Sequence, residues 1–251
     1  MQIISLPAFR DNYIWLLRNG STATVVDPGD AAPVLRYLVD EDLTLGAILI
    51  THHHSDHVGG IDALLAAHPV PVYGPAREAI PAITRPVGNG DVVSVPGADF
   101  QVIDVPGHTA GHVAYYAAPT LFCGDTLFAA GCGRIFEGTP AQLFASLERL
   151  AELPGDTQVY CTHEYTMSNL AFAAAVEPNN SAIAERMALC QALRADERPT
   201  VPFRLDGERR SNPFLRTREA EVIRQAEAQA GRGLSGPEEV FAALREWKNR
   251  F

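Results

Sequence analysis

The sequence predicts an α/β fold followed by a helical C-terminal part, and two patterns lead to this prediction. Between residues 1 and 163, short apolar runs alternate with segments of helical periodicity, and Gly, Pro and Asp separate them. After residue 163, helical segments follow one another with Pro and Gly breaks between them. A chain of 251 residues can bury the core of one large domain or of two. We therefore expect one domain over residues 1–163 and a helical domain over residues 164–251.

The first domain holds the predicted strands. Short apolar runs bounded by turn residues predict strands at 3–6, 13–17, 23–26, 45–50, 69–73, 92–95, 100–105 and 113–116. Helical spacing predicts helices at 34–39, 61–68 and 141–153, and Asp30 can cap the first of them. In the second domain, helices are expected at 169–176, 181–194, 218–230 and 237–250, with Pro and Gly breaks from Pro199 to Pro213.

Charge divides the chain at the same place. Residues 1–163 carry 7 Arg and 17 Asp plus Glu, so 7 − 17 = −10, whereas residues 164–251 carry 13 of each sign and sum to zero. All eight histidines lie in the first part, and the only lysine, Lys248, lies in the second. This asymmetry predicts an acidic, metal-holding part and an arginine-rich second part. The net charge of −10 argues against a nucleic-acid-binding protein.

Composition also bears on the compartment. No apolar run approaches the ~20 residues of a membrane span, and the first residues lack the basic segment and cleavage site of a signal peptide. The four cysteines are widely spaced and form no C-x-x-C pair, so a reducing environment is expected. We expect a cytoplasmic protein with no membrane partner. No pattern reports directly on oligomeric state, and a monomer is the expectation.

The loop over residues 51–60 carries the strongest functional signal. It follows the predicted strand 45–50 and contains His52, His54, Asp56 and His57 in the pattern H-x-H-x-D-H. The C-terminal end of a buried strand is the usual place for a site in an α/β fold. Imidazole nitrogen and carboxylate oxygen are metal donors near neutral pH, and packing hardly explains four such groups within six residues. The loop therefore predicts a metal site.

Three later residues have similar settings. His108 lies in the sequence PGHTAGH, while Asp125 in LFCGDT and His163 in VYCTHE each follow a strand-like run. We regard all three as further metal donors.

The remaining histidines are expected not to bind metal. His53 lies between two donors and is predicted to point away from them. His112 is predicted to orient the loop that carries His108, since metal-binding loops are commonly held by such outer hydrogen bonds. His68 ends a predicted helix and is expected at the surface.

The pattern H-x-H-x-D-H followed by single His, Asp and His donors resembles the metallo-β-lactamase superfamily. Motifs in the later part resemble its glyoxalase II, or hydroxyacylglutathione hydrolase, branch: GCGR (131–134), CTHEYT (161–166), NPFLR (212–216) and REWK (245–248). The resemblance extends from Gln2 to Phe251. It implies an αβ/βα four-layer sandwich with metals at the edge where strand ends from both halves converge, and a C-terminal helical domain that binds substrate.

The resemblance also implies how the donors divide between ions. One ion would take His52, His54 and His108, the second would take Asp56, His57 and His163, and Asp125 would bridge both. Asp27 is implied to lie beneath the site as a hydrogen-bond acceptor, although it can equally be a turn residue. Histidine and aspartate suit zinc, iron or manganese. We expect two divalent ions, with zinc as the first choice.

The implied reaction is hydrolysis of S-(2-hydroxyacyl)glutathione. S-D-lactoylglutathione would give glutathione and D-lactate, the second step of methylglyoxal detoxification. Two divalent ions can activate a shared water toward the thioester carbonyl, so no serine or cysteine nucleophile is required, and no G-x-S-x-G elbow is present. Asp56 and Asp125 are the candidate catalytic carboxylates, and Asp56 can orient the water and accept its proton.

Substrate recognition is also implied by resemblance. Arg245 and Lys248 would bind the glycine carboxylate of glutathione, and Arg134 and Tyr165 would contact its cysteinyl part. Arg245 and Lys248 are three residues apart and share a helix face, although basic residues also favour a solvated helix C-terminus. Phe136 stands where a tyrosine hydroxyl often helps to hold the substrate, so one hydrogen bond to glutathione is in question.

Other functions stay open at this point. A persulfide dioxygenase of the same superfamily would use one iron and is expected to lack one donor set, whereas all seven donors are present. A non-enzymatic relative would lack donors, and a nucleic-acid-processing relative would not carry a net charge of −10. β-Lactam hydrolysis as a side activity is disfavoured by the cytoplasmic expectation and by the arginine-rich tail.

Overall fold

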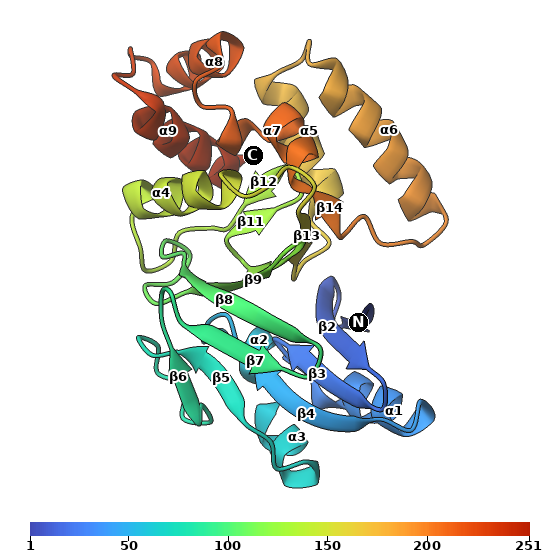
Figure 1. Ribbon diagram of the computed structural model, residues 1–251. Coiled ribbons are helices and arrows are strands. Elements are labelled where there is room, and N and C mark those ends of the chain that lie inside the picture. Colours follow the sequence, from blue (N-terminus) through green and yellow to red (C-terminus); the bar gives the residue numbers. More distant parts are fainter. The chain divides into compact units, whose positions relative to one another are not determined.

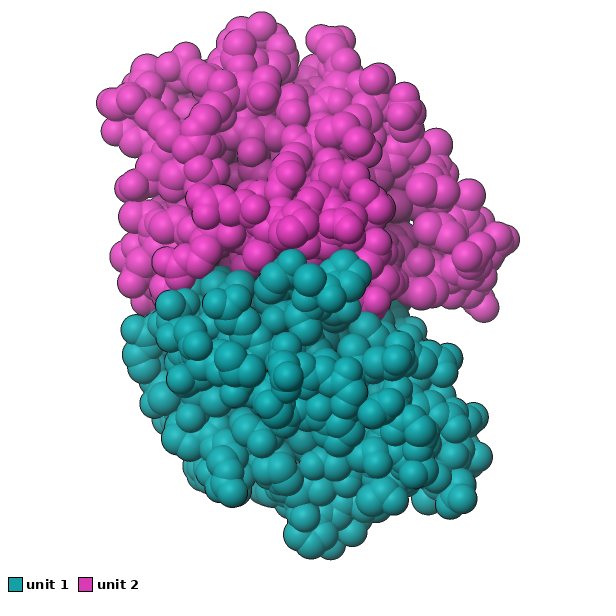
Figure 2. Space-filling model, in the orientation of Figure 1, with its two compact units in different colours: residues 1–105, 109–124 teal, residues 106–108, 125–251 magenta.

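The computed structural model describes residues 1–251, which form two compact units. Unit 1 comprises residues 1–105 and 109–124, and unit 2 comprises residues 106–108 and 125–251 (Figure 2). The predicted alternation of strands and helices and the helical C-terminal part are both present (Figure 1). The two units divide the chain by packing, at a place other than residue 163. The boundary between domains 1–163 and 164–251 stays a prediction.

The first sheet of unit 1 has six strands in the order β1-β2-β3-β4-β5-β6. They are β1 (Gln2–Ala8), β2 (Asn12–Asn19), β3 (Thr22–Val26), β4 (Thr44–Leu49), β5 (Val72–Pro75) and β6 (Arg85–Val87). The first three pair antiparallel, and β3 to β6 pair parallel. Parallel neighbours require crossovers, and α1 (Ala31–Asp40) and α3 (Ile61–Ala67) lie in those from β3 to β4 and from β4 to β5. β5 begins at Val72, three residues later than the strand predicted from residue 69.

The core of unit 1 lies between this sheet and its helices. β2, β3 and β4 are buried along most of their length, as is typical of strands covered on both faces. The helices contribute Val34, Leu38, Ile61 and Leu64 to this core. Asp30 caps α1 as predicted, and its carboxylate accepts from the Ala32 N–H at 2.9 Å. Because β4 is buried, the first residues of the loop that follows it are held in place.

Four strands of unit 1 belong to a second sheet in the order β10-β9-β8-β7. They are β7 (Val92–Val95), β8 (Ala98–Asp104), β9 (Val113–Ala117) and β10 (Thr120–Gly124), each antiparallel to its neighbour. Tyr115 of β9 is fully buried, and its hydroxyl donates to the Ile50 carbonyl at 2.8 Å. Burial raises the pKa of Tyr115, so the hydroxyl keeps its proton. The second sheet thus holds the end of β4.

Unit 2 is mainly helical. Its helices are α4 (Pro140–Ala151), α5 (Thr166–Val176), α6 (Ser181–Ala195), α7 (Leu205–Ser211), α8 (Ala220–Ala230) and α9 (Pro237–Arg250), with a 3-10 turn at Pro213–Leu215. The strands β11 (Leu127–Phe128) and β12 (Gly131–Cys132) form a hairpin, and β13 (Gln158–Cys161) pairs with β14 (Phe203–Arg204). Across both units, no helix combines the length and the apolar character that a membrane crossing needs.

Several elements of unit 2 were not predicted, among them α7 and the β11–β12 hairpin. α7 contains Gly207, which indicated a break, but its buried residues Leu205, Glu208 and Ser211 anchor the helix by tertiary contacts. Such contacts commonly override a weak helix propensity. The β11–β12 hairpin has strands of two residues each, too short to show the alternation that indicates a strand.

Candidate metal centre

The predicted metal loop continues from β4 into a short helix, α2 (Ser55–Val58). His54 occupies the position before this helix, while Asp56 and His57 lie within it. His52 and His57 are fully buried, and the Asp56 side chain is 37% exposed. A Cβ atom at Gly29 would overlap the Asp56 carbonyl, so glycine at this position allows the turn after β3 to pack directly against α2. Unit 1 therefore brings all four predicted donors of the motif together.

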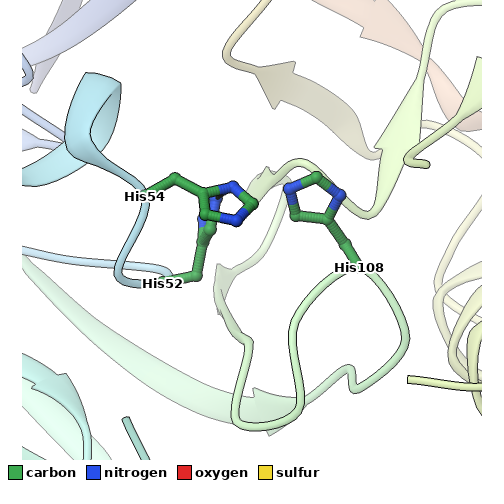
Figure 3. Close-up of side chains that lie close together, drawn as sticks. All are labelled: His52, His54 and His108. Atoms are coloured by element: carbon green, nitrogen blue, oxygen red, sulfur yellow. Dashed lines mark hydrogen bonds between the residues drawn. The ribbon is translucent and has the colours of Figure 1, made fainter. Parts of the chain in front are cut away.

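The rings of His52 and His54 converge. His52 Nε2 lies 3.0 Å from His54 Nδ1, and both rings are labelled in Figure 3. His52 Nδ1 lies 3.1 Å from Thr51 Oγ1, whose hydroxyl donates to Asp27 at 2.7 Å. Because Thr51 donates its proton to a carboxylate, its oxygen accepts from His52 Nδ1. This assignment leaves the lone pair of His52 on Nε2, directed toward His54.

Asp27 is the buried acceptor beneath this loop, as predicted. Its carboxylate, 2% exposed, accepts from the Thr51 N–H at 2.8 Å and from the Thr51 hydroxyl. Asp27 Oδ2 also lies 3.0 Å from His57 Nδ1. A carboxylate at Nδ1 holds the ring proton there and leaves the lone pair on Nε2. One carboxylate therefore sets the tautomers of two predicted donors, directly for His57 and through Thr51 for His52.

Asn12 is a residue of the site that sequence reasoning missed. Its side-chain amide donates to Asp56 Oδ2 at 3.0 Å, and Asn12 itself is 6% exposed. The amide fixes one oxygen of the carboxylate that is proposed to be catalytic. Asn12 begins β2 and lies 44 residues from Asp56, so no local pattern connects the two.

Glu78 is a second residue that was missed, and it explains the orientation of His53. The N–H and Nδ1 of His53 both lie 2.6 Å from Glu78 Oε2. Glu78 Oε1 accepts from the Gly111 N–H at 3.0 Å and from the Thr109 hydroxyl. The prediction that His53 makes structural hydrogen bonds is confirmed. The Glu78 side chain, 2% exposed, ties the loop of residues 51–57 to that of residues 109–112.

His112 lies against the donors of unit 1. Its ring stacks on that of His52 with centroids 4.6 Å apart, and its Nδ1 lies 3.0 Å from the Val113 carbonyl. This contact limits the orientations open to the His52 ring. The predicted role of His112 in orienting the loop of His108 stays a prediction.

Unit 2 brings the other three predicted donors together. Asp125 Oδ2 lies 3.4 Å from His108 Nε2 and 3.3 Å from His163 Nε2. All three residues are at most 6% exposed. His108 Nδ1 donates to the Arg134 carbonyl at 2.7 Å, so its lone pair is on Nε2. A carboxylate oxygen between two imidazole Nε2 atoms is a suitable donor set for a divalent ion.

Helix α4 supports the loop of His108. The Ser146 hydroxyl donates to the Pro106 carbonyl at 2.8 Å. Gly107 has φ of +146°, and a Cβ atom there would overlap the backbone of Leu143. Only glycine therefore permits the loop to approach α4 so closely and to present His108.

Aromatic residues surround the donors of unit 2. The Tyr165 ring stacks on His163 with centroids 4.6 Å apart and planes at 3°. The Phe136 ring lies edge-on to His108 at 5.3 Å, and the Arg134 guanidinium lies 5.6 Å from the Phe136 centroid. Tyr165 and Phe136 are 37% and 60% exposed, so both can meet a ligand. The predicted substrate residues Arg134 and Tyr165 therefore lie beside predicted donors.

The other two predicted substrate residues lie on α9. Arg245 is 7% exposed, and its Nη1 donates to the carbonyls of Cys132 at 3.0 Å and Gly133 at 3.4 Å. Lys248 Nζ donates to the Ser168 carbonyl at 3.0 Å. Burial and then the Arg245 charge lower the pKa of Lys248 to about 8. Arg245 is thus committed to the backbone of Cys132 and Gly133, at the end of β12, while Lys248 has the less buried position.

The residues present fit divalent metal ions by the chemistry of their donors. Hydrogen bonds at Nδ1 direct the Nε2 lone pairs of His52, His57 and His108 away from the partner groups. Neutral imidazole and carboxylate together suit zinc, iron and manganese. Outer groups that fix the donors in this way are typical of metal sites.

Comparisons with known proteins identify two family models along the chain. Residues 8–163 match the family model of the metallo-beta-lactamase superfamily, and residues 164–251 match that of the hydroxyacylglutathione hydrolase C-terminus. A hydroxyacylglutathione hydrolase from Pseudomonas fluorescens is 56% identical, with 100% of both chains covered. The structure of ETHE1 from Myxococcus xanthus is 26% identical with a TM-score of 0.67, covering 99% of this chain and 98% of that one.

A second solved structure that resembles this chain contains metal ions. TTHA1623 in a di-iron-bound form is 33% identical with a TM-score of 0.55, covering 65% of this chain and 92% of that one. Together, the family matches and the solved structures confirm the predicted fold class, the metallo-β-lactamase-like sandwich with a helical C-terminal part.

Proposed function

Because the chain belongs to the metallo-β-lactamase superfamily and, along its whole length, to the hydroxyacylglutathione hydrolases, we propose that it hydrolyses S-(2-hydroxyacyl)glutathione. With S-D-lactoylglutathione the products are glutathione and D-lactate, the second step of methylglyoxal detoxification. The observation that carries this proposal is the match of the helical part to the hydroxyacylglutathione hydrolase C-terminus, since the superfamily fold alone does not select a substrate.

The proposed centre takes two divalent ions. One would be held by His52, His54 and His108 and the other by Asp56, His57 and His163, with Asp125 shared between them. Zinc is the first choice, and iron or manganese are the alternatives. The di-iron form of a relative supports two ions rather than one. The tautomers set by Asp27 and by the Arg134 carbonyl support these residues as donors.

The chain's own residues prepare the reaction. When bound, two divalent ions would lower the pKa of a water and polarise the thioester carbonyl. Asp56 then orients the water and accepts its proton, while Asn12 holds Oδ2 of that carboxylate by its amide. Asp27 and Thr51 keep the protons of His57 and His52 on Nδ1. No serine or cysteine nucleophile takes part.

The substrate's glutathione part is proposed to lie on residues of unit 2. Arg134 and Tyr165 contact the cysteinyl segment, and Arg245 and Lys248 attract the glycine carboxylate. Because Arg245 Nη1 already donates to two carbonyls, we assign the stronger contact with the carboxylate to Lys248. Phe136 contributes an apolar surface in place of a hydroxyl.

The organisation of the protein completes this proposal. Residues 1–163 form the catalytic domain, and residues 164–251 form the substrate-binding domain. The enzyme acts as a monomer in the cytoplasm, with a glutathione thioester as its partner and neither nucleic acid nor membrane.

The test is hydrolysis of S-D-lactoylglutathione by the purified protein, with metal analysis of the same sample. We expect thioester loss together with about two ions per chain. Two ions without thioester hydrolysis would contradict the substrate and leave the metal centre standing. One iron with persulfide-dependent oxygen uptake would contradict both and favour the dioxygenase.

The variant Asp56→Ala sharpens this test. Since Asp56 is proposed both as a donor and as a proton acceptor, metal content and turnover should fall together. Asp62→Ala is the matched control, because Asp62 is an acid on the neighbouring helix α3 outside the proposed donor set. Wild-type turnover of Asp56→Ala at full metal content would refute the assigned role.

A further inference from the structure

The backbone of the β11–β12 hairpin is held by side chains from the helices of unit 2. Asn212 Nδ2 donates to the Gly131 carbonyl at 2.9 Å and to the Phe128 carbonyl at 3.4 Å. Asn169 Nδ2 donates to the Ala129 carbonyl at 3.1 Å. Arg245 Nη1 donates to the carbonyls of Cys132 and Gly133. Main-chain groups over residues 128–133 thus depend on partners 40 to 113 positions away in the sequence.

Glu208 is the centre of this arrangement. It is fully buried, and its Oε2 accepts from the Ala130 N–H at 2.8 Å and from Asn212 at 2.9 Å. Its other oxygen pairs with Arg186 of α6. Ala130 has φ of 54°, a conformation uncommon for a residue with a side chain. A buried carboxylate is costly unless it is fully paired, so its presence at this turn indicates a specific requirement for it.

The hairpin connects one proposed donor to the hydrogen-bond partner of another. Asp125 precedes β11, and Arg134, whose carbonyl accepts from His108 Nδ1, follows β12. The Gly133 N–H donates to the Thr126 carbonyl at 3.1 Å, and a Cβ atom at Gly133 would overlap the Asp125 carbonyl. The backbone after β12 therefore packs directly on the backbone that carries Asp125. A shift of the hairpin moves Asp125 and the hydrogen-bond partner of His108 together.

We propose that Glu208, Asn212 and Asn169 are positioning residues of the metal centre. They set the backbone of residues 128–133 and, through it, the placement of Asp125 and His108. This inference rests on the proposed metal centre. It gives the helical part a second role beside substrate binding, because the helices also place two of the seven proposed donors.

The test compares two buried glutamates. Glu208→Gln keeps the volume but removes the charge that faces Arg186 and disturbs the acceptor of the Ala130 N–H. Glu177→Gln is the matched control: Glu177 is 4% exposed and pairs with Arg216 through two hydrogen bonds, in the same unit but with no bond to the hairpin. Each variant is titrated with zinc against a chromophoric chelator, and kcat, KM and thermal unfolding are measured.

Both variants should unfold at lower temperature, since each loses a buried ion pair. Only Glu208→Gln should bind zinc more weakly, by about tenfold, and lose kcat with KM unchanged. If both variants match the wild type in zinc affinity and kcat, the helices stabilise the fold but do not position the donors, and the inference is wrong while the proposed function stands. If the wild-type protein binds no zinc, the proposed function is contradicted. The positioning role then fails as well, because it rests on the metal centre.

A third variant covers the case in which Glu208→Gln does not fold. Asn169→Ala removes one neutral hydrogen bond to the hairpin and leaves the Glu208 charge paired. It should lower zinc affinity by a smaller factor, about threefold, with KM unchanged. Unchanged zinc affinity in a folded Asn169→Ala protein would overturn the inference.

Discussion

The two sets of proposed donors are built in different ways. In unit 1, His52, His54, Asp56 and His57 lie within six residues of one loop. In unit 2, the donors His108, Asp125 and His163 are spread over 56 residues, from 108 to 163. The first set is fixed by side chains, of which Asp27 serves two rings. The second depends on main-chain groups, since His108 donates to the Arg134 carbonyl.

This difference has a consequence for robustness. One buried carboxylate in unit 1 controls several donors, so a single substitution can misplace them together. A carbonyl of the backbone is present whatever side chain the residue carries, so substitutions at Arg134 leave the partner of His108 in place. The positions that matter in unit 2 are those that shape the backbone, such as Glu208.

The largest effect is expected from Asp27→Ala. The change removes the acceptor of His57 Nδ1 and of Thr51, and through Thr51 it disturbs His52. We expect metal content to collapse and turnover to fall by roughly 100-fold, the upper range for an outer partner of a metal ligand. Asp30→Ala is the control, because Asp30 caps α1 and should cost only about 1 kcal/mol of stability. Equal metal content in both variants would show that the side chain does not control the donors.

Arg134→Ala should separate backbone from side chain. The carbonyl that accepts from His108 stays, so we expect two bound ions as in the wild type. The loss of the guanidinium from the substrate should raise KM by about tenfold, as for a charged hydrogen bond. Arg134→Lys should restore much of this loss, and metal analysis with steady-state kinetics checks both. Loss of metal in Arg134→Ala would mean that the side chain, and not the backbone, supports His108.

The smallest effect is expected at Lys248, outside both donor sets. Its pKa of about 8 means that the ammonium is charged below that pH and neutral above it. The attraction for the glycine carboxylate is therefore full well below pH 8, half lost at about pH 8 and lost as the pH rises further. We expect kcat/KM to fall about threefold between pH 7.5 and 9.5. Lys248→Arg stays charged throughout this range, so its profile should lack the fall; the same fall in that variant would assign it to another group.

Local pattern alone determined much of this protein. The strand, polar loop and helix around residues 45–67 are contiguous, and periodicity and turn residues act over a few positions. The sequence therefore predicted the α/β alternation and the helical C-terminal part. It also indicated four candidate metal donors, whose side chains unit 1 brings close together. It also predicted that His53 points away and that Asp27 accepts hydrogen bonds beneath the loop.

Only the tertiary structure decided which residues hold the donors. Asn12 reaches Asp56 across 44 positions, Glu78 reaches His53 across 25, and Glu208 reaches Ala130 across 78. No short-range signal distinguishes these residues from surface polar groups. They matter because a buried polar group must find a partner, and the fold decides which groups are buried together. The residue types close together in the sequence thus determined which side chains could bind metal. Burial and hydrogen bonds between residues distant in the sequence determined how these side chains are held.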